Sequence, residues 1–260
     1  MASPAIATKL ADTRVTYLSQ PMPVNMGDWW FEIATMDHFW VQRRFEVTKR
    51  LAGPLLRDAR RIGEIGCGNG LMQRQLEDAY GVPVTGFELN EIALNKNISR
   101  LSPLFCYNIH DRNPQFRGHF DVLIMFDVLE HIADETGFLQ SVKYHLAASG
   151  RLLVNVPAHQ FLYSSYDRAA GHVRRYSMQQ LEEVVSQCGF STRIASYWGL
   201  SLLPLLLVRK GVRLRHEDGR AGFDPGSNAL NRLLSLLAKC EPIPQAFLGT
   251  SVMAVFENHG

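Results

Sequence analysis

Three glycines at alternate positions, Gly66, Gly68 and Gly70, stand between an apolar run and a helical pattern. Glycine allows a sharp turn from strand to helix and lets a ligand lie against the main chain, where a Cβ atom would clash. Glu64, just before the turn, places a carboxylate that could hold a cationic ammonium group and would repel a pyrophosphate. Glu88 ends the next apolar run, where a carboxylate can accept both hydroxyls of a ribose. These residues predict a site for a nucleoside that carries a positive charge.

A second group of polar residues follows the apolar run 119–126. Asp127, Glu130 and His131 are spaced at i, i+3 and i+4, so on a helix they would share one face. His131 could act as a general base toward an acceptor hydroxyl, or it could cap or brace the start of that helix. The spacing therefore leaves both roles open.

The segment 157–176 lacks regular periodicity, and a loop of this length inside a compact domain is typical of a functional segment. It ends in the sequence GHVRRY, in which His172 could serve as a base and Tyr176 could orient an acceptor. Arg174 and Arg175 could bind an anionic acceptor, or they could pair with acids of the loop and hold it down. Further residues of the loop are expected to line the entrance to the site: His159, Tyr163, Tyr166 and Asp167.

Regular elements must position these groups, and short apolar runs alternate with helical periods along the chain. The pattern predicts strands over 61–65, 83–88, 103–108, 119–126 and 150–156, and helices over 69–80, 90–100 and 127–148. An earlier helix starts from Asp37, and a later one starts at Ser177, with capping-box spacing to Gln180. Two more strands are expected at 191–198 and 250–257. Strands separated by helices of this length imply βαβ crossovers and a mostly parallel sheet covered on both faces.

The composition is that of a soluble globular protein, with 260 residues, 46% hydrophobic and 20% charged. The 27 Lys and Arg residues against 25 Asp and Glu residues give a net charge of +2, which is not the footprint of a nucleic-acid binder. Four cysteines without C-x-x-C spacing favour a reducing, cytoplasmic compartment. The N-terminus has no signal-peptide pattern, and the longest apolar stretch, 200–208, is less than half of the about 20 residues that a membrane span needs.

Residues 60–190 resemble the class I S-adenosylmethionine-dependent methyltransferases. The resemblance rests on EIGCGNG, on the acid in FELN, and on FDVLIMFDVLEHIAD followed by LLVNVP. It implies a doubly wound, Rossmann-like α/β fold with a seven-stranded, mostly parallel sheet whose last strand is antiparallel. The hairpin of 191–198 and 250–257 would supply that pair. It also implies S-adenosyl-L-methionine as methyl donor and S-adenosyl-L-homocysteine as product.

The resemblance implies particular cofactor contacts in this chain. The first acid and the glycine turn would surround the methionine moiety, Glu88 would bind the ribose, and Leu89 would pack beside the adenine. Where the family usually has Asp near the end of its third strand, this chain has Asn108, which could still accept the adenine hydrogen bond beside the backbone of Ile109. Two residues where the fourth strand opens would lie beneath the methionine end. The expected set is Glu64, Gly66, Cys67, Gly68, Gly70, Glu88, Leu89, Asn108, Ile109, Phe126 and Asp127.

Two narrower resemblances concern the acceptor side. GHVRRY is similar to a segment after the fifth strand in a branch of bacterial methyltransferases, where the loop covers the acceptor side. Asp127, Glu130 and His131 resemble the Glu-x-x-Glu-His metal-binding pattern of ubiquinone-pathway O-methyltransferases. Two carboxylates and an imidazole could hold a divalent cation that lowers the pKa of a hydroxyl. The prediction is a site without metal, with this cation as the alternative.

The sequence thus predicts an enzyme that methylates a small or medium metabolite in a biosynthetic pathway, at oxygen rather than nitrogen or carbon, because histidines flank the site. A catalytically silent module that binds the cofactor or a protein partner is the alternative from another class, and a homodimer stays open. A nicotinamide dehydrogenase fits less well, because its glycine pattern would need glycine where Leu71 stands.

The expected parts of the chain are a helical N-terminal lid (1–58), a cofactor-binding core (59–198), a helical insertion (199–249) and the final strand (250–260). The Leu-rich stretch 200–208 and a helix at 229–238 are expected to pack on each other, although exposure would mark an interface, a membrane contact or an acceptor channel. Aromatic residues near the N-terminus favour core packing or a lid over an aromatic cage: Trp29, Trp30, Phe31, His38, Phe39 and Trp40.

Overall fold

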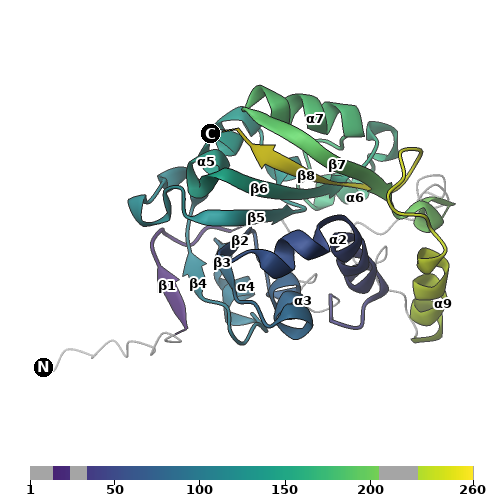
Figure 1. The fold of residues 1–260 in the computed structure, drawn as a ribbon. Coiled ribbons are helices and arrows are strands. Elements are labelled where there is room, and N and C mark those ends of the chain that lie inside the picture. Colours follow the sequence, from purple (N-terminus) through teal and green to yellow (C-terminus); the bar gives the residue numbers. More distant parts are fainter. Residues whose placement is uncertain (1–13, 24–33, 205–227, 260) are drawn as a thin grey trace, which may run out of the picture.

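The computed structural model describes residues 14–23, 34–204 and 228–259 (Figure 1). Within these residues one sheet has eight strands, in the order β1-β4-β3-β2-β5-β6-β8-β7. The strands are β1 (Val15–Tyr17), β2 (Ile62–Ile65), β3 (Val84–Glu88), β4 (Leu104–Cys106), β5 (Phe120–Phe126), β6 (Leu146–Pro157), β7 (Phe190–Trp198) and β8 (Ser251–Asn258). The α-helices are α2 (Phe39–Asp58), α3 (Leu71–Tyr80), α4 (Glu91–Asn95), α5 (Glu135–His145), α6 (Ser165–Ala169), α7 (Met178–Gln187) and α9 (Asn228–Lys239).

The sheet has the predicted topology. Strands β1 to β6 pair in parallel, and β8 pairs antiparallel with both β6 and β7. The doubly wound α/β class and the antiparallel last strand are therefore confirmed. The seven predicted strands correspond to β2 through β8, and β1 adds an eighth at the edge, with Val15 beside Leu104. A strand of three residues is too short for periodicity to reveal it.

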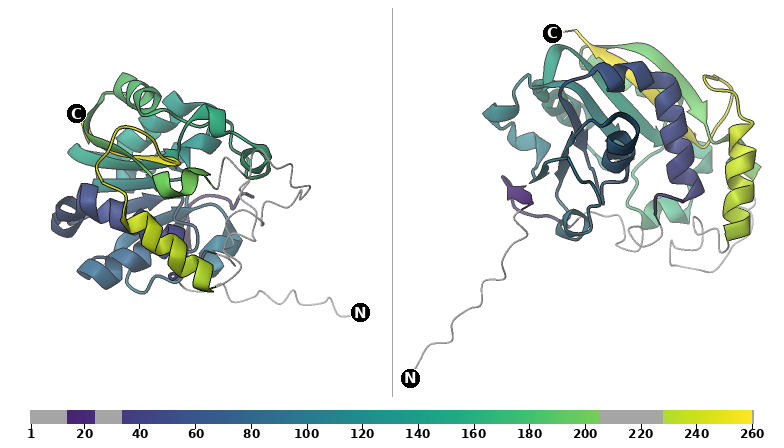
Figure 2. Two further views of the ribbon diagram at one scale, coloured as in Figure 1. Left: turned by 90° about the vertical axis from the view of Figure 1, so that its right-hand side faces the viewer. Right: turned by 60° about the horizontal axis from the view of Figure 1, so that its bottom comes forward.

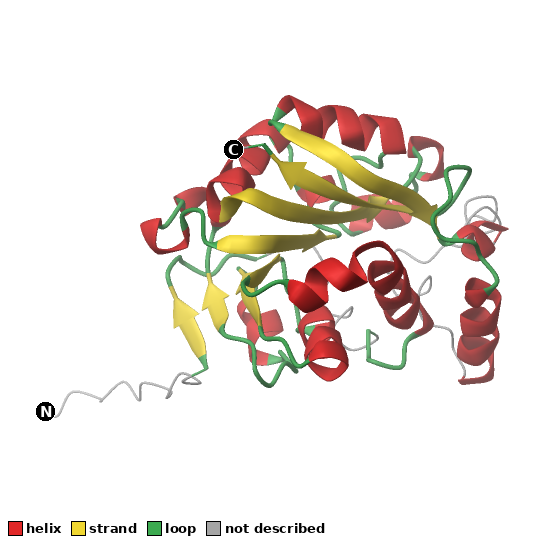
Figure 3. Cartoon of the chain, viewed as in Figure 1, coloured by secondary structure: helices red, strands yellow, loops and turns green. Residues whose placement is uncertain are grey.

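Helices cover both faces of the sheet, as Figure 3 shows. The side chains of β5 pack against the helices of both faces. Leu123 and Met125 pack in a cluster with α5 and α7, whereas Val122 and Ile124 pack in a second cluster with α2 and α3. Successive side chains of a strand point to opposite faces, so a strand that is apolar throughout is expected in the middle of such a sheet. The continuous apolar run of β5 therefore places its carboxyl end between two packed layers.

The N-terminal helix and the C-terminal insertion pack on the same face. In α2, Phe39 and Trp40 are buried, and the Trp40 ring lies 4.3 Å from that of Trp198. Helix α9 runs beside α2 (Figure 2), where the Asn231 side chain accepts a hydrogen bond from the backbone of Phe39 at 2.9 Å. None of the described helices combines the length and apolar character that crossing a bilayer requires. The aromatic residues Trp29, Trp30 and Phe31 and the stretch 205–208 lie outside the described residues.

The helix predicted over 127–148 is wrong as a single element. After β5 the chain forms a 3₁₀ helix, Leu129–His131, and α5 then starts behind Asp134, whose side chain accepts the Gly137 N–H at 3.0 Å. Short 3₁₀ helices also occur at Ile109–Asp111, Pro114–Phe116, Gln160–Leu162 and Leu200–Leu202. Because α5 ends at His145, β6 begins earlier than the predicted strand 150–156. The predicted capping box at Ser177 and Gln180 is present at the start of α7.

Candidate active site

The glycine turn joins β2 to α3, and its three glycines all have positive φ angles: 69° at Gly66, 52° at Gly68 and 79° at Gly70. Glycine adopts this region without the steric cost that other residues meet. A Cβ atom on Gly66 would lie 2.6 Å from a methyl group of Val128, and one on Gly70 would lie 2.5 Å from the Asn97 amide oxygen. The turn therefore requires glycine both for its backbone conformation and for close packing against the protein itself.

Glu88 ends β3 with its carboxylate against this turn. One carboxylate oxygen accepts the Gly68 N–H at 2.9 Å, and the other accepts the N–H groups of Leu89 and Asn90 at 2.8 and 2.9 Å. Burial raises the pKa of Glu88, while these backbone donors oppose the rise. Each carboxylate oxygen can accept two hydrogen bonds, so the oxygen that binds Gly68 can accept another. The geometry fits an acid that receives a ribose hydroxyl at the carboxyl end of β3.

Glu64 on β2 is buried, and among the described residues its Oε2 atom has no hydrogen-bond partner. Burial raises the pKa of Glu64 to about 8; the charge of Arg44 opposes the rise and that of Glu88 adds to it. A buried carboxylate oxygen without a partner is costly, and a cationic ammonium group would satisfy it. The residues present therefore fit the methionine ammonium group of the predicted cofactor.

A pH-dependent stability difference follows from Glu64. Above about pH 4.5 the unfolded chain ionises this carboxyl group, whereas the folded protein keeps it protonated up to about pH 8. Stability therefore falls as the pH rises through this window, because the unfolded state binds fewer protons. We expect Glu64→Gln to raise the Tm of the ligand-free protein more at pH 8 than at pH 5, measured by thermal unfolding. An equal change in Tm at both pH values, or the same pH-dependent gain in the exposed-site control Glu91→Gln, would contradict this assignment.

Arg44 of α2 lies at the same end of the sheet and is absent from the predicted set. Its Nη1 atom pairs with Asp127 Oδ2 at 2.7 Å, and its guanidinium carbon lies 5.4 Å from the centroid of the Phe126 ring. Its charge also acts on Glu64. Sequence reasoning missed Arg44 because it stands among several basic residues of one helix and no spacing distinguishes it.

Asp127 has a left-handed backbone, with φ at 55°. Its Oδ1 atom accepts a hydrogen bond from the Asn155 amide at 2.7 Å, and the Asn155 oxygen accepts the Trp198 indole N–H at 2.8 Å. A non-glycine residue in this region costs about 1–3 kcal/mol and persists where the surroundings fix it. Arg44 and Asn155 provide that restraint. Asp127 thus holds the end of β5 in place, with its carboxylate already paired.

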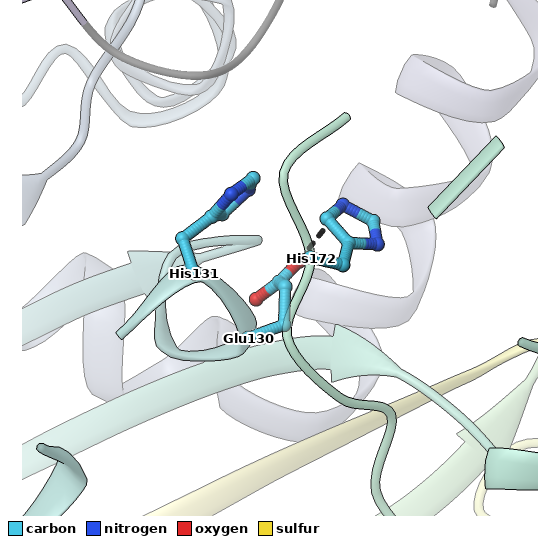
Figure 4. A group of neighbouring side chains, drawn as sticks. All are labelled: Glu130, His131 and His172. Carbon is cyan, nitrogen blue, oxygen red and sulfur yellow. Dashed lines mark ion pairs between the residues drawn. The ribbon is translucent and has the colours of Figure 1, made fainter. Parts of the chain in front are cut away.

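The polar cluster after β5 differs from the one that the spacing predicted. Glu130 and His131 lie in the 3₁₀ helix after β5, so Asp127 does not share a long helix face with them. The residues whose ligand atoms all lie within 4.8 Å of one another are Glu130, His131 and His172 (Figure 4). The backbone N–H of Val173 binds the Glu130 carbonyl at 2.8 Å and so joins the loop to the 3₁₀ helix. His172 therefore takes the place that the prediction gave to Asp127.

His172 is held by a buried acid. Its Nδ1 atom lies 2.9 Å from Asp167 Oδ1, and its Nε2 atom lies 4.0 Å from Glu130 Oε1. Burial would raise the pKa of Asp167, but the hydrogen bonds and charges of His172 and Arg175 lower it to about 2. The His131 ring lies 4.8 Å from that of His172, and burial together with His172 lowers the pKa of His131 to about 4. The Asp167 contact orients His172 with Nε2 toward the other two residues.

The two arginines and the tyrosine of the GHVRRY sequence hold the loop. Arg175 donates to Asp167 at 2.7 Å, and Arg174 pairs with Glu135 of α5. The buried Tyr176 hydroxyl donates to Glu135 at 2.6 Å, and burial, with Glu135 adding to it, raises the pKa of Tyr176. Of the two alternatives for the arginines, this arrangement matches pairing with acids, so binding of an anionic acceptor stays a prediction.

Of the other loop residues that were expected to line the entrance, Tyr163 and Tyr166 lie near His172 and His159 does not. The Tyr163 hydroxyl donates to the His172 carbonyl at 2.7 Å, and the Tyr166 ring lies 6.3 Å from the His172 ring. His159, with φ at 60°, stacks on the Tyr197 ring at 4.7 Å instead. Tyr163 and Tyr166 thus belong to the cluster's surroundings, whereas His159 packs against β7.

The side predicted to bind the adenine contains an unexpected segment. Asn108 accepts the His110 N–H at 3.0 Å through its side chain, and its own N–H donates to Ser19 at 2.8 Å. The Leu89 carbonyl accepts the N–H of Met22 at 3.0 Å. The residues after β1 therefore run past the ends of β3 and β4, where Leu89, Asn108 and Ile109 were predicted to meet the adenine. Because β1 has only three residues, no sequence pattern indicated that this segment lies there.

Comparison with known proteins identifies the family of this chain. The family model described as "Methyltransferase domain" matches residues 33–193. The fold resembles a SAM-dependent methyltransferase from Archaeoglobus fulgidus (TM-score 0.54, 15% identity, covering 83% of this chain and 94% of that one). It also resembles magnesium protoporphyrin IX methyltransferase from Synechocystis PCC 6803 with bound SAH (TM-score 0.52, 13% identity, covering 85% and 83%).

A third similar structure is phosphoethanolamine N-methyltransferase 2 of Haemonchus contortus in complex with S-adenosyl-L-methionine, with a TM-score of 0.55 and 19% identity. The match covers 85% of this chain and 53% of that one. A search of curated proteins finds no match. The chain belongs to the methyltransferase-domain family, and the prediction of an S-adenosylmethionine-dependent methyltransferase domain is confirmed.

Proposed function

We propose that this protein transfers the methyl group of S-adenosyl-L-methionine to a hydroxyl group of a small or medium metabolite. The glycine turn and Glu88 bind the adenosyl part, and Glu64 binds the methionine ammonium group through the oxygen that has no partner among the described residues. When bound, the cofactor supplies an electrophilic methyl group on a sulfonium. Methyl transfer then depends on alignment of the acceptor with that methyl group and on exclusion of water.

The acceptor oxygen lies against Glu130, His131 and His172 in this proposal. It forms a bond to the methyl carbon as the carbon–sulfur bond breaks and its electron pair stays on sulfur, and the hydroxyl proton passes to His172 Nε2. The observation that supports this step is the contact between Asp167 and His172 Nδ1, because it leaves Nε2 to face the cluster. A general base of this kind contributes about 10²–10⁴-fold.

Oxygen is favoured over nitrogen and carbon by these histidines alone. The similar Haemonchus contortus enzyme is named as an N-methyltransferase, so the fold also serves nitrogen. Incubation with S-adenosyl-L-methionine carrying a ¹³C-methyl group and a panel of hydroxylated and amino metabolites tests the choice by NMR of the product. A methoxy resonance supports the proposal, and an N-methyl or C-methyl resonance overturns the choice of oxygen. Absence of methyl transfer despite S-adenosylhomocysteine binding would favour the silent module.

Arg44 is proposed to bind the carboxylate of the methionine moiety. Its guanidinium lies beside Phe126 and Asp127, and among the described residues its Nε atom has no hydrogen-bond partner. A charge-assisted hydrogen bond contributes about 1.5–3 kcal/mol, so Arg44→Met should weaken S-adenosylhomocysteine binding about tenfold or more in calorimetric titration. The matched control is Arg50→Met, an exposed residue of the same helix. Equal affinity of the two variants would remove Arg44 from the site.

A further inference from the structure

We propose that Glu130, His131 and His172 bind one divalent transition-metal cation, of which Zn²⁺ is the best match. The inference deepens the proposed function and rests on its hydroxyl acceptor. One carboxylate and two imidazoles come from two segments that meet in the fold, the 3₁₀ helix after β5 and the loop after α6. Figure 4 shows the Glu130 side chain between the two histidines.

The main structural support for a cation at this place is Glu130. Its side chain is 0% exposed, and among the described residues neither carboxylate oxygen has a hydrogen-bond partner. The side-chain nitrogen that the structure places nearest to it, His172 Nε2, lies 4.0 Å from Oε1, beyond hydrogen-bond distance. Two orphan oxygens on one buried carboxylate are costly unless a ligand satisfies them. A cation between Glu130 and the two imidazoles would do so.

The outer contact of His172 matches that of a metal ligand. A histidine that binds a metal through one ring nitrogen usually donates its other N–H to a carboxylate or a carbonyl, which fixes the ring. His172 makes such a contact, because its Nδ1 atom lies 2.9 Å from the acceptor Asp167 Oδ1. Arg175 also donates a hydrogen bond to Asp167, at 2.7 Å. The Val173 N–H on the Glu130 carbonyl fixes the loop against the 3₁₀ helix. The orientation of His172 is therefore set before a cation enters.

The donor set selects the type of cation. Imidazole suits Zn²⁺, Cu²⁺, Fe²⁺ and Ni²⁺, whereas Mg²⁺ and Ca²⁺ prefer oxygen ligands throughout. Two histidines and one glutamate are also a known catalytic ligand set for Zn²⁺, with a further position for substrate. Ligand atoms of a tetrahedral Zn²⁺ lie about 3.3 Å apart. The atoms of this cluster lie within 4.8 Å, and His172 Nε2 lies 4.0 Å from Glu130 Oε1, so side-chain rotations of both His131 and Glu130 are needed to bring the three ligand atoms to this spacing.

A cation at this place changes how the acceptor loses its proton. As a Lewis acid it lowers the pKa of a hydroxyl group beside it, so the proton can leave to water, and His172 then serves as a ligand instead of receiving the proton. The bonds made and broken at carbon and sulfur stay as proposed above. Glu130, which the transfer step did not use, becomes a ligand in this arrangement.

Calorimetric titration of the chelator-treated protein with Zn²⁺ tests the site. We expect one saturable event per chain, no comparable event with Mg²⁺, and a tetrahedral Co²⁺ absorption spectrum when Co²⁺ replaces Zn²⁺. Loss of an outer-shell partner costs 10–100-fold in metal affinity, so Glu130→Gln and His131→Ala, which remove direct ligands, should each weaken Zn²⁺ binding about 10²-fold or more. All titrations use Cys240→Ser as background, because Cys240 is exposed and its thiol could bind Zn²⁺ by itself.

The matched control is His259→Ala, an exposed histidine outside the cluster, which should bind Zn²⁺ like the parent protein. Thermal unfolding checks that Glu130→Gln, which keeps the shape of the side chain, is folded. Absence of Zn²⁺ binding, or equal affinity in Glu130→Gln and the parent, overturns the site. If the protein binds S-adenosylhomocysteine but not Zn²⁺, the proposed function stands and only the cation site is refuted. If the protein binds Zn²⁺ but transfers no methyl group, the cation site stands and the proposed function is refuted.

Discussion

Replacing His172 with alanine is expected to slow methyl transfer about 10²–10⁴-fold while S-adenosylhomocysteine affinity changes by less than about twofold. Both the proton transfer proposed at Nε2 and the proposed cation require this imidazole, so its loss removes the chemistry on the acceptor side. Among the described residues, no hydrogen bond or ion pair joins His172 to the glycine turn or to Glu88, which are proposed to bind the cofactor, so the effect should not reach cofactor binding. Single-turnover rates at saturating donor measure the first quantity, and calorimetry measures the second.

Two further variants distinguish a direct effect of His172 on the rate from an effect of lost stability. His172→Ala leaves Asp167 with Arg175 and without its imidazole partner, so a loss of stability could lower the rate indirectly. His172→Asn keeps a hydrogen-bond donor for Asp167 and should be as slow as the alanine variant with a Tm closer to the parent. His259→Ala should keep the parent rate. A rate for His172→Asn within a few-fold of the parent would exclude His172 from the reaction and leave alignment alone as the source of catalysis.

Replacing Glu88 with alanine is expected to weaken S-adenosylhomocysteine binding about 10²-fold. A hydrogen bond to a charged group is worth about 1.5–3 kcal/mol, and the ribose hydroxyl expected at the oxygen that binds Gly68 loses its acceptor, so we expect a loss of binding free energy near the upper end of this range. The expected loss in turnover at saturating cofactor is small, because Glu88 is proposed to bind the adenosyl part and not the acceptor. Calorimetric titration with the product cofactor measures the affinity.

Glu88 also binds three backbone N–H groups, so the alanine variant will lose some stability as well as affinity. Glu88→Gln keeps an oxygen for the Leu89 and Asn90 N–H groups and separates the two effects, since it should regain stability but not full affinity. The control Glu91→Ala, at an exposed residue of α4, should bind as the parent does. If Glu88→Ala bound S-adenosylhomocysteine with parental affinity, Glu88 would have only its structural role at the turn.

The sequence predicted most of the fold, and it indicated the residues proposed for cofactor binding, because the signals there are local. Apolar runs mark the buried strands, and the three glycines mark a turn that needs positive φ angles. Glu88 was found because a strand ends at it. These features follow from neighbouring residues in the chain, which a single sequence displays.

The acceptor side was predicted only in part because it depends on contacts between distant segments. The i, i+3, i+4 spacing suggested a helix face, but the left-handed turn at Asp127 and the 3₁₀ helix after it broke that face. His172 then reached Glu130 through the loop, a tertiary contact without sequence periodicity. Arg44 was missed for the same reason, since only the packing of α2 distinguishes it from Arg50.

A crystal structure of the protein with S-adenosyl-L-homocysteine tests the central proposal most directly. We expect a ribose hydroxyl within hydrogen-bond distance of the Glu88 oxygen that binds Gly68, and the amino-acid ammonium group at the Glu64 oxygen that has no partner among the described residues. The adenosyl part should follow the main chain of Gly66 to Gly70. A ligand bound elsewhere, or one whose ribose and ammonium group contact neither carboxylate, would contradict the account.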